Sequence, residues 1–254
     1  MDIIGEELKV VLVTSQLNYM PKNYSKTIEG ILASSDGRIT SLIEIENLDY
    51  SYIKSGLGLI FYGARNFGSQ LLKNLIRARF SSKKSLCDKY EVEHRMFKSI
   101  NNKEAVSYLN SEKFDLLINL RTRCIYKRKA LESTRLGCLN IHHGLLPKYR
   151  GTMCDLNALS AGRSAGFSIH MMDEKIDNGD IIRVVEVSSS ERDYFKYLEQ
   201  TRDFEVDAIK ELLDYISEHN SLPKGLVNKS EDSIYTKTPD ISAVRDYIRK
   251  GMIL

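Results

Sequence analysis

Short apolar runs that alternate with segments of helical spacing constrain the fold of this chain more than any other feature. Strands are predicted at residues 8–14, 38–45, 92–97 and 114–120, of which the first and the last are the apolar runs. The segments of helical spacing cover residues 24–32, 68–80 and 103–111. Strands that alternate with helices form a parallel sheet with helices on both faces. We therefore predict an α/β fold with a doubly wound, mostly parallel sheet, whose ligands bind beyond the carboxyl ends of the strands.

Two segments between the second and third predicted strands have weaker patterns. Residues 56–63 predict a strand or a hairpin edge, and residues 83–89 predict a charged loop. Gly56 and Gly58 do not form a dinucleotide-binding motif, because that motif follows a strand whereas this segment precedes one. The sequence also contains no Walker motif, so neither nicotinamide dinucleotides nor nucleoside triphosphates are indicated as ligands.

The pattern changes after Ile182. Residues 193–219 predict a long amphipathic helix, residues 233–237 a strand, and residues 238–240 the cap of a last helix that ends near Lys250. We therefore divide the chain into a larger domain over residues 1–190 and a short α+β extension over residues 191–254.

Composition excludes several classes of protein. Of the 254 residues, 42% are hydrophobic and 28% charged, as in ordinary globular domains. The net charge of +3 slightly favours anionic small molecules and does not indicate nucleic acid, which needs a concentrated basic face. The four cysteines lack Cys-x-x-Cys spacing, so we expect free thiols and no metal site. Because neither a long apolar run nor a signal sequence is present, we expect a cytoplasmic protein.

The segment from Leu139 to Gly151 carries the first candidate site. Asn140 and His142 alternate with apolar neighbours, so on a strand both side chains project to the same side. An Asn supplies a fixed N–H donor and a His exchanges a proton near neutral pH, so the pair suits a reacting carbonyl group. Taken alone, the same residues are more typical of polar side chains at the end of a strand.

A second segment follows at residues 166–182, with a predicted strand that contains Gly166 and His170. Taken alone, His170 is typical of a structural hydrogen bond, and Asp177-Asn178-Gly179 is typical of a hairpin turn. Four groups of residues nevertheless occur in a fixed order: Asn140-Ile141-His142, Leu145-Leu146-Pro147, Gly166 to His170, and Asp177-Asn178-Gly179. Together they resemble the folate-dependent formyltransferase family, over roughly residues 115–182.

The resemblance implies a Rossmann-like formyltransferase core, with N10-formyltetrahydrofolate as formyl donor and no metal. It implies that Asn140 and His142 stabilise the oxyanion of the transferred formyl group and that His142 also carries a proton. Asp177 would orient or deprotonate through a water molecule and keep His142 charged when needed, since a nearby negative charge raises the pKa of a histidine.

The resemblance also implies a set of residues around the folate donor, many of them through backbone groups. The set consists of Arg123, Cys124, Ile125, Tyr126, Leu139, Met172, Asp173, Glu174 and Ile176. Arg121-Thr122-Arg123 departs from the family pattern, which has a small apolar or glycine-containing stretch at this place.

Length and tail favour a nucleotide-linked amino sugar as the acceptor of the formyl group. The tail from Tyr235 to Pro239 is similar to that of sugar N-formyltransferases. Glycinamide ribonucleotide enzymes carry a glycine-rich phosphate loop after the first strand, where this chain has residues 14–18. Methionyl-tRNA formyltransferases carry a C-terminal β-barrel domain, and residues 183–254 are too few and differently patterned. Formyltetrahydrofolate deformylases share the Asn-Ile-His-His string but carry a further N-terminal domain.

Other acceptors and activities stay open. The other acceptors are methionyl-tRNA and a siderophore or peptide amine. The other functions are deformylation of the folate and an inactive folate-binding module. The protein partner that we expect is a second copy of the chain, in a homodimer. For the acceptor we expect contacts from Ser15, Asn18, Lys148, Tyr149 and Arg150. Arg150 is the candidate ligand of a diphosphate or carboxylate, because its planar guanidinium donates two parallel hydrogen bonds.

Overall fold

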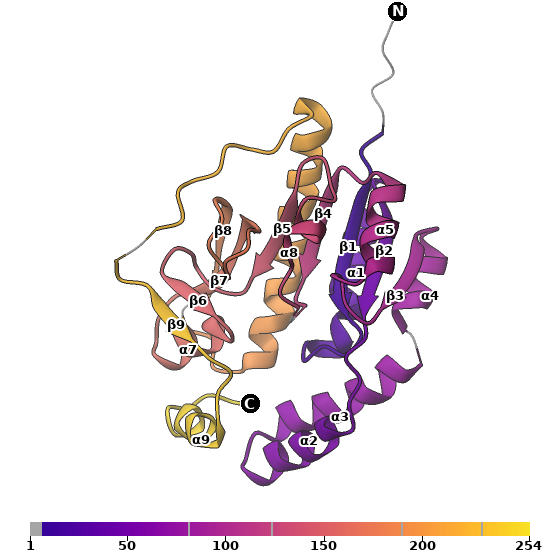
Figure 1. Cartoon of the computed structure of the whole chain (residues 1–254). Helices are drawn as coiled ribbons and strands as arrows, with labels where there is room; N and C mark the ends of the chain where they lie inside the picture. The colour runs from indigo at the N-terminus through magenta and orange to yellow at the C-terminus, as the bar shows by residue number, and fades with distance from the viewer. Residues whose placement is uncertain (1–6, 81, 123, 189, 230) are drawn as a thin grey trace, which may run out of the picture.

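The computed structural model describes residues 7–80, 82–122, 124–188, 190–229 and 231–254 (Figure 1). A seven-stranded sheet forms its centre, with the strand order β3-β2-β1-β4-β5-β7-β8. The first five strands in this order are parallel, and β7 and β8 are antiparallel to their neighbours. The strands are β1 (Val10–Ser15), β2 (Ile39–Ile45), β3 (Glu93–Phe97), β4 (Leu116–Leu120), β5 (Cys138–His142), β7 (Ala165–Met171) and β8 (Ile181–Ser188).

Helices cover both faces of this sheet (Figure 1). On one face, side chains such as Leu12 of β1 pack against α1 (Ser25–Ser34), which follows the short 3-10 helix η1 (Pro21–Tyr24), and against α8 (Tyr194–His219). On the other face, Val11 and Val13 pack against α5 (Lys103–Glu112) and α6 (Arg128–Leu131). Strand β1 is apolar without interruption because both of its faces are covered. The predicted fold class is confirmed.

Helix α8 belongs to the main core of the protein. Tyr197, Leu198 and Leu213 of α8 are buried in the same cluster as Ile28 of α1 and Leu12 of β1. Residue 190, at which we divided the chain, therefore does not separate two hydrophobic cores.

Two predicted elements are wrong. Residues 56–63 lie mostly in helix α2 (Ser51–Phe61), which packs against α3 (Arg65–Arg79). Gly56 faces Gly68 of α3 so closely that a Cβ on Gly56 would lie 3.3 Å from the Gly68 carbonyl oxygen. These glycines permit a close helix contact, which a strand pattern does not distinguish. Residues 83–89 lie in helix α4 (Ser82–Lys89), because Leu86 and Cys87 pack into the core.

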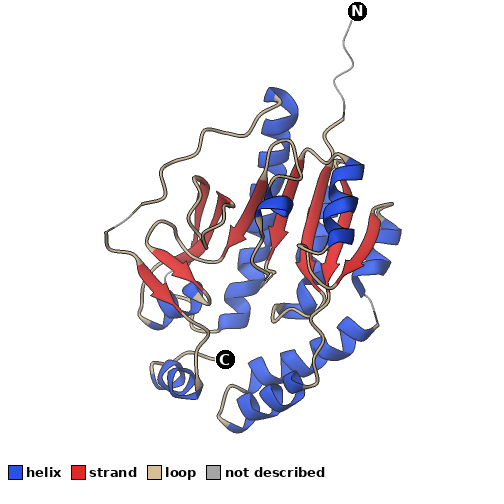
Figure 2. Ribbon diagram, in the orientation of Figure 1, coloured by secondary structure: helices blue, strands red, loops and turns tan. Residues whose placement is uncertain are grey.

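The C-terminal segment returns to the centre of the chain. Strand β9 (Ile234–Thr236) pairs in parallel with β6 (Tyr149–Gly151), which precedes α7 (Cys154–Ser160). Helix α9 (Ile241–Arg249) follows, and the Ala243 backbone N–H donates to the Asp240 carboxylate at 2.8 Å, as the predicted cap requires. Among the described helices, none is long and apolar enough to cross a membrane. The arrowheads of the parallel strands point toward α2, α3 and α9 (Figure 2).

Candidate active site

A cavity of about 440 Å³ opens beyond the carboxyl ends of β4 and β5, at the edge of the sheet where the sequence predicts a ligand. Asn119 of β4 and both Asn140 and His142 of β5 line it, together with the loop between β7 and β8 that contains Asp177. Asn140 and His142 therefore share one side of their strand, as predicted. The volume is in the usual range for small-molecule sites.

Three polar side chains form a row across neighbouring strands. Asn140 lies opposite Asn119 of β4 and opposite His170 of β7 in the strand registers. Asn119 Nδ2 donates to Asn140 Oδ1 at 2.7 Å, and Asn140 Nδ2 lies 3.1 Å from His170 Nε2. Thr122 and Tyr126 donate their hydroxyl groups to Asn119 Oδ1. The row fixes the orientation of the Asn140 amide.

The direction of each hydrogen bond in the row follows from His170. Its Nδ1 lies 2.7 Å from the Met171 carbonyl oxygen, which only accepts, so Nδ1 carries a hydrogen. Burial, helped by the nearby His142, lowers the pKa of His170 from 6.5 to about 4, so the ring is neutral and Nε2 accepts from Asn140. One amide hydrogen of Asn140 is used in this bond. The other is available to a ligand in the cavity that Asn140 lines.

His142 lies between a carbonyl oxygen and a carboxylate. Its Nε2 lies 2.9 Å from the Tyr149 carbonyl oxygen, and its Nδ1 lies 3.4 Å from Asp177 Oδ1. Burial lowers the pKa of His142 below its usual value, and Asp177 and the Tyr149 carbonyl oppose this effect only in part. At rest the loss of hydration thus outweighs the nearby carboxylate, whose charge can act on His142 only when the ring takes up a proton. The resting imidazole is therefore neutral, and its hydrogen lies on Nε2, because the Tyr149 carbonyl oxygen only accepts. Nδ1 is then unprotonated and faces Asp177 Oδ1.

Asp177 is held from both its side chain and its backbone. Its Oδ2 accepts from the Gly151 N–H at 2.8 Å, and its carbonyl oxygen accepts from Arg150 Nη1 and, at 3.0 Å, from Asn228 Nδ2. The backbone of Asp177 is left-handed, with φ of 49°. A Cβ at Gly151 would collide with the Thr236 carbonyl oxygen, so only glycine fits between β6 and β9. The C-terminal segment thus helps to place the Asp177 carboxylate, although Asp177 is far from this segment in the sequence.

Comparison with known proteins identifies the family. A sequence profile described as "Formyl transferase" matches residues 73–213, more than half of the chain. The chain belongs to the formyl transferase family. The methionyl-tRNA formyltransferase of Thermotoga maritima is 28% identical in an alignment of length 223 that covers 75% of this chain and 71% of that protein. The bifunctional polymyxin resistance protein ArnA of Wigglesworthia glossinidia brevipalpis is 34% identical over 121 residues, 47% of this chain and 18% of that protein.

Solved structures share the fold of this formyltransferase. A phosphoribosylglycinamide formyltransferase from Anaplasma phagocytophilum has a TM-score of 0.62 and 17% identity, covering 91% of this chain and 98% of that chain. A sugar N-formyltransferase from a Shewanella species has a TM-score of 0.58 and 16% identity, covering 95% and 87%. An N-formyltransferase from Helicobacter canadensis, solved with folinic acid and dTDP-3-aminofucose, has a TM-score of 0.53 and 15% identity, covering 96% and 80%. At these identities the likeness concerns the fold.

Most residues that we expected around the donor line the cavity of the formyltransferase. They are Cys124, Ile125 and Tyr126 on one side and Met172, Asp173, Glu174 and Ile176 on the other. Leu139 does not line it, because this side chain points from β5 into the core and is fully buried. Arg123 lies outside the described residues. Arg121, from the departing stretch, contributes its side chain to the cavity wall.

Of the residues expected to contact the acceptor, only Asn18 lines the cavity. Ser15 is buried at the end of β1, where its carbonyl oxygen accepts from Lys83 at 3.1 Å. Lys148 is exposed, with its amine 5.8 Å from the centre of the Tyr149 ring. Tyr149 is buried and contributes its carbonyl oxygen to His142. None of these three residues lines the cavity, so the structure does not place them for the expected contacts with the acceptor.

Arg150 has a different role from the one we expected. It is buried, and its guanidinium donates to the Asp177 carbonyl oxygen and to the Asn228 backbone and side-chain oxygens at 2.9 and 2.8 Å. Its Nε donates to Ser233 at 3.4 Å. Every nitrogen of the guanidinium therefore has a protein acceptor. The hypothesis that Arg150 binds an anionic substrate is wrong, since the same planar group fastens the Asp177 loop to the C-terminal segment.

The sequence analysis missed two groups of residues. Asn119 and Asn228 hold Asn140 and Asp177; a polar residue inside the apolar run at 114–120 was a signal for Asn119, whereas nothing in the sequence marks Asn228. The second group is a buried charged network around His143. His143 Nε2 lies 2.7 Å from Glu205 Oε1, and His143 Nδ1 lies 3.6 Å from Asp155 Oδ2.

Arg121 completes this network behind the cavity, with its Nη2 3.9 Å from Asp155 Oδ2. Burial raises the pKa of Asp155 and of Glu205, but His143 and Arg121 outweigh it, so both carboxyl pKa values are below their usual range. His143, to which the family resemblance gave no role, thus holds two buried carboxylates. Departure from the family pattern at Arg121 has a structural reason, because its charge balances this network.

Proposed function

We propose that this formyltransferase moves a formyl group from N10-formyltetrahydrofolate to a primary amine, and that the amine is the amino group of a nucleotide-linked sugar. The observation that supports formyl transfer most directly is the convergence of Asn140, His142 and Asp177 on one cavity. In it, Asn140 Nδ2 lies 3.1 Å from His170 Nε2, and His142 Nδ1 lies 3.4 Å from Asp177 Oδ1. We also propose residues 1–190 as the catalytic unit, to which Asn228 and Thr236 contribute from the remaining segment.

In this proposal Asn140 stabilises the oxyanion. When the amine attacks the formyl carbon, the carbonyl oxygen gains negative charge, and a donor that is already oriented lowers the barrier. The free amide hydrogen of Asn140 is such a donor, because Asn119 and His170 fix the rest of the amide. No rearrangement of Asn140 is then needed as the charge develops.

His142 transfers the proton. Its neutral Nδ1 accepts the proton that the attacking amine loses, and later gives this proton to the folate nitrogen as the bond from carbon to that nitrogen breaks. The new bond joins the acceptor nitrogen to the formyl carbon, so atoms and charges balance. Asp177 Oδ1, 3.4 Å from Nδ1, stabilises the imidazolium formed between the two steps. The role of His142 as the base is supported by its lowered pKa, because the resting imidazole is then neutral and can accept a proton.

The donor would lie between the two loops that flank the catalytic residues. Ile125 and Ile176 are exposed apolar side chains on opposite sides of the cavity, and Tyr126 and Met172 lie deeper. A flat ring system fits between apolar walls that also offer backbone N–H and carbonyl groups. Bound there, the donor would supply a formyl carbon next to Asn140 and His142.

A second cavity offers space for the acceptor. It has a volume of about 780 Å³ and shares Tyr19, Met153 and Thr238 with the catalytic cavity. Helices α2 and α9 form its walls. The likeness in fold to sugar N-formyltransferases over most of both chains supports a sugar acceptor. The Thermotoga relative supports methionyl-tRNA as a second candidate.

One assay tests these proposals. The purified protein is mixed with N10-formyltetrahydrofolate and, separately, with nucleotide-linked amino sugars, methionyl-tRNA and small peptide amines. Release of tetrahydrofolate is followed by absorbance and the formylated product by mass spectrometry. We expect turnover that depends on the amine, highest with one of the nucleotide sugars, and lost in the Asp177→Asn variant.

Each other outcome has a distinct meaning. Turnover with methionyl-tRNA alone would replace the sugar by the second candidate. Donor consumption at the same rate without any amine would identify a deformylase, because a transferase excludes water from the formyl carbon. Donor binding without turnover under all conditions would identify a folate-binding module.

A further inference from the structure

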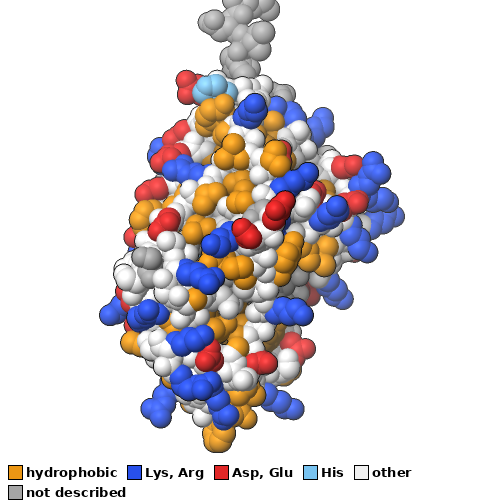
Figure 3. Space-filling model, turned by 90° about the vertical axis from the view of Figure 1, so that its left-hand side faces the viewer, with side chains coloured by type: hydrophobic (Ala, Val, Ile, Leu, Met, Phe, Trp, Pro, Cys, Tyr) orange, Lys and Arg blue, Asp and Glu red, His pale blue; other side chains and the backbone are white. Residues whose placement is uncertain are grey.

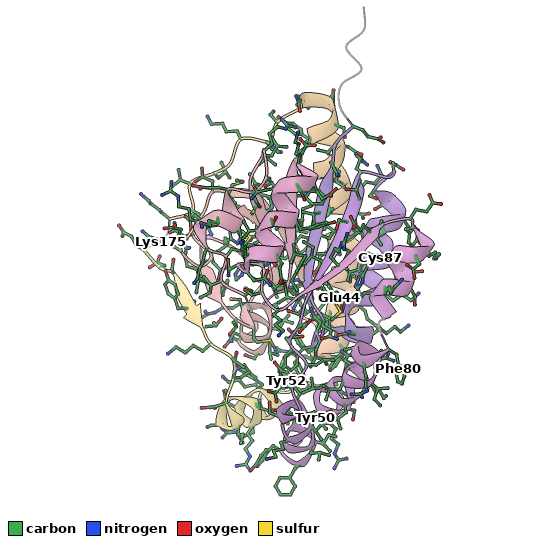
Figure 4. All side chains as sticks on the ribbon, turned by 45° about the vertical axis from the view of Figure 1, so that its right-hand side comes forward. Glu44, Tyr50, Tyr52, Phe80, Cys87 and Lys175 are labelled. Atoms are coloured by element: carbon green, nitrogen blue, oxygen red, sulfur yellow. The ribbon has the colours of Figure 1, made fainter. Side chains whose placement is uncertain are left out.

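Helix α2 lines the second cavity through Lys54, Gly58 and Leu59, but the exposed apolar side chains of the hairpin formed by α2 and α3 line neither cavity. The hairpin lies between β2 and β3 in the sequence and extends from the end of the molecule at which the strands end (Figure 1). Figure 4 labels Tyr50, which precedes α2, and Phe80, which follows α3, in the lower part of the molecule. The hairpin nevertheless carries more exposed large apolar side chains than its packing requires.

The exposed apolar side chains of α2 form one stripe. Tyr50, Ile53, Leu57 and Phe61 follow each other at intervals of three or four residues, which places them on one face of a helix. Tyr50 is 78% exposed and Phe61 82%. The opposite contacts of α2 are made through Gly56, which approaches α3. The stripe therefore faces away from the contact that holds the hairpin together.

Helix α3 combines exposed apolar and basic side chains. Ile76 and Phe80 are exposed, Phe80 by 78%, and Lys73 and Arg65 are exposed on the same face by helical spacing. Arg79, next to Phe80, is exposed as well. Such a mixture is uncommon on a free surface, because large apolar side chains exposed together mark an interaction site.

The charge of the hairpin has one sign. Between residues 50 and 87 the sequence contains no Asp or Glu, although the whole chain contains 34. The charged residues of the two helices are all basic: Lys54, Arg65, Lys73, Arg77 and Arg79. Figure 3 views the molecule from the side of β9 and α9, and its lower end shows Lys and Arg beside hydrophobic side chains and a few Asp and Glu side chains. An occupant of this surface must be both apolar and anionic.

We propose that the α2–α3 hairpin docks this protein onto the surface of an anionic lipid bilayer. Amphipathic helices with Leu, Ile and Phe on one face and Lys and Arg beside them lie at the boundary between headgroups and acyl chains. Leu57 and Phe61 insert among the acyl chains, and Arg65, Lys73 and Arg79 contact the anionic headgroups. This contact is peripheral, and it goes beyond the proposed formyl transfer, on which it does not depend.

Two other occupants fit the surface less well. A second copy of the chain in a two-fold symmetric dimer would place one acid-free basic hairpin against another, and like charges in an interface repel. An RNA would use the basic residues and stack on Tyr50 or Phe61, but it would leave the aliphatic Ile53, Leu57 and Ile76 without a partner. Only a lipid surface uses both kinds of side chain.

The test is flotation of the full chain with vesicles of phosphatidylcholine, with and without phosphatidylglycerol. We expect binding only with phosphatidylglycerol, weakened by salt. We expect binding to these vesicles to be weakened by roughly tenfold or more in a Leu57→Ser/Phe61→Ser variant and in an Arg65→Glu/Arg79→Glu variant. The matched controls Phe204→Ser on α8 and Lys129→Glu on α6 change exposed residues of the same kinds and should bind like the unchanged protein.

Circular dichroism and amine-dependent formyl transfer, measured without vesicles, report whether each variant is folded. Absence of binding to phosphatidylglycerol vesicles would overturn the proposal. Binding of both hairpin variants as strong as that of the unchanged protein would overturn it as well. A concentration-dependent dimer that the Leu57→Ser/Phe61→Ser variant abolishes, without vesicle binding, would assign the surface to a second copy. A shift with an RNA hairpin, again without vesicle binding, would assign it to nucleic acid.

Discussion

Replacement of Asn228 by alanine should damage the active site from a distance. The side chain donates to the Asp177 and Gly179 carbonyl oxygens at 3.0 and 2.9 Å and accepts from Arg150 Nη2 at 2.8 Å. Each buried hydrogen bond contributes about 1 kcal/mol, so Asn228→Ala should lower the free energy of unfolding by about 3 kcal/mol. Because Asp177 loses one of its anchors, turnover should fall by roughly tenfold or more, in line with the cost of a small misplacement at a reacting centre.

The assay compares urea unfolding, kcat and donor affinity in Asn228→Ala and in Asn178→Ala. Asn178 is the matched control, because it lies in the same loop and makes an exposed hydrogen bond to Asp173 at 2.7 Å. We expect the control to change stability by less than about 0.5 kcal/mol. A destabilised Asn228→Ala variant with unchanged kcat would refute the idea that this residue places Asp177. Equal stability of both variants would refute the clamp itself.

Three further predictions follow from the site. Burial lowers the pKa of His170 from 6.5 to about 4, so between these pH values the unfolded chain binds a proton that the folded chain does not. Acidification from about pH 7.5 to about pH 5 should therefore lower the free energy of unfolding by about 2 kcal/mol, measured by urea unfolding. The His170→Gln variant should lack this part of the loss. His142→Ala should lower turnover by roughly a hundredfold or more with little change in donor affinity by calorimetry; normal turnover there and none in His143→Ala would move the proton transfer to His143. Gly151→Ala should lose at least about 2 kcal/mol, whereas Gly37→Ala, with positive φ but open space around it, should lose less; equal losses would argue against the contact with Thr236.

The fold was predictable because its determinants are local. Continuous apolar runs such as β4 record burial on both faces of a sheet, and the helices between them have the spacing of one buried side. The order of Asn140-Ile141-His142 and Asp177-Asn178-Gly179 likewise records chemistry that needs particular side chains at particular places. Gly179 fits this pattern, since a Cβ there would collide with the Met171 carbonyl oxygen.

What could not be predicted depends on contacts between distant segments. Arg150 resembles a substrate ligand in sequence, and only the arrival of Asn228, 78 residues later, shows that its guanidinium is occupied. His142 and Asp177 were correctly paired, but the sequence does not contain the degree of burial that decides the direction of the pKa shift. The strand predicted at residues 56–63 failed for a similar reason, because the partner of Gly56 lies in another helix.

The C-terminal segment links the proposed acceptor cavity to Asp177, the proposed catalytic carboxylate. Thr236 of β9 donates to the Thr152 carbonyl oxygen at 2.7 Å, and the Gly151 N–H beside it holds Asp177. Thr238, two residues further on, lines both cavities. A contact that shifts Thr238 therefore acts on the same strand pair that places Asp177. We expect substitutions in this segment to change kcat together with KM for the amine, whereas acceptor residues on an independent segment would change KM alone.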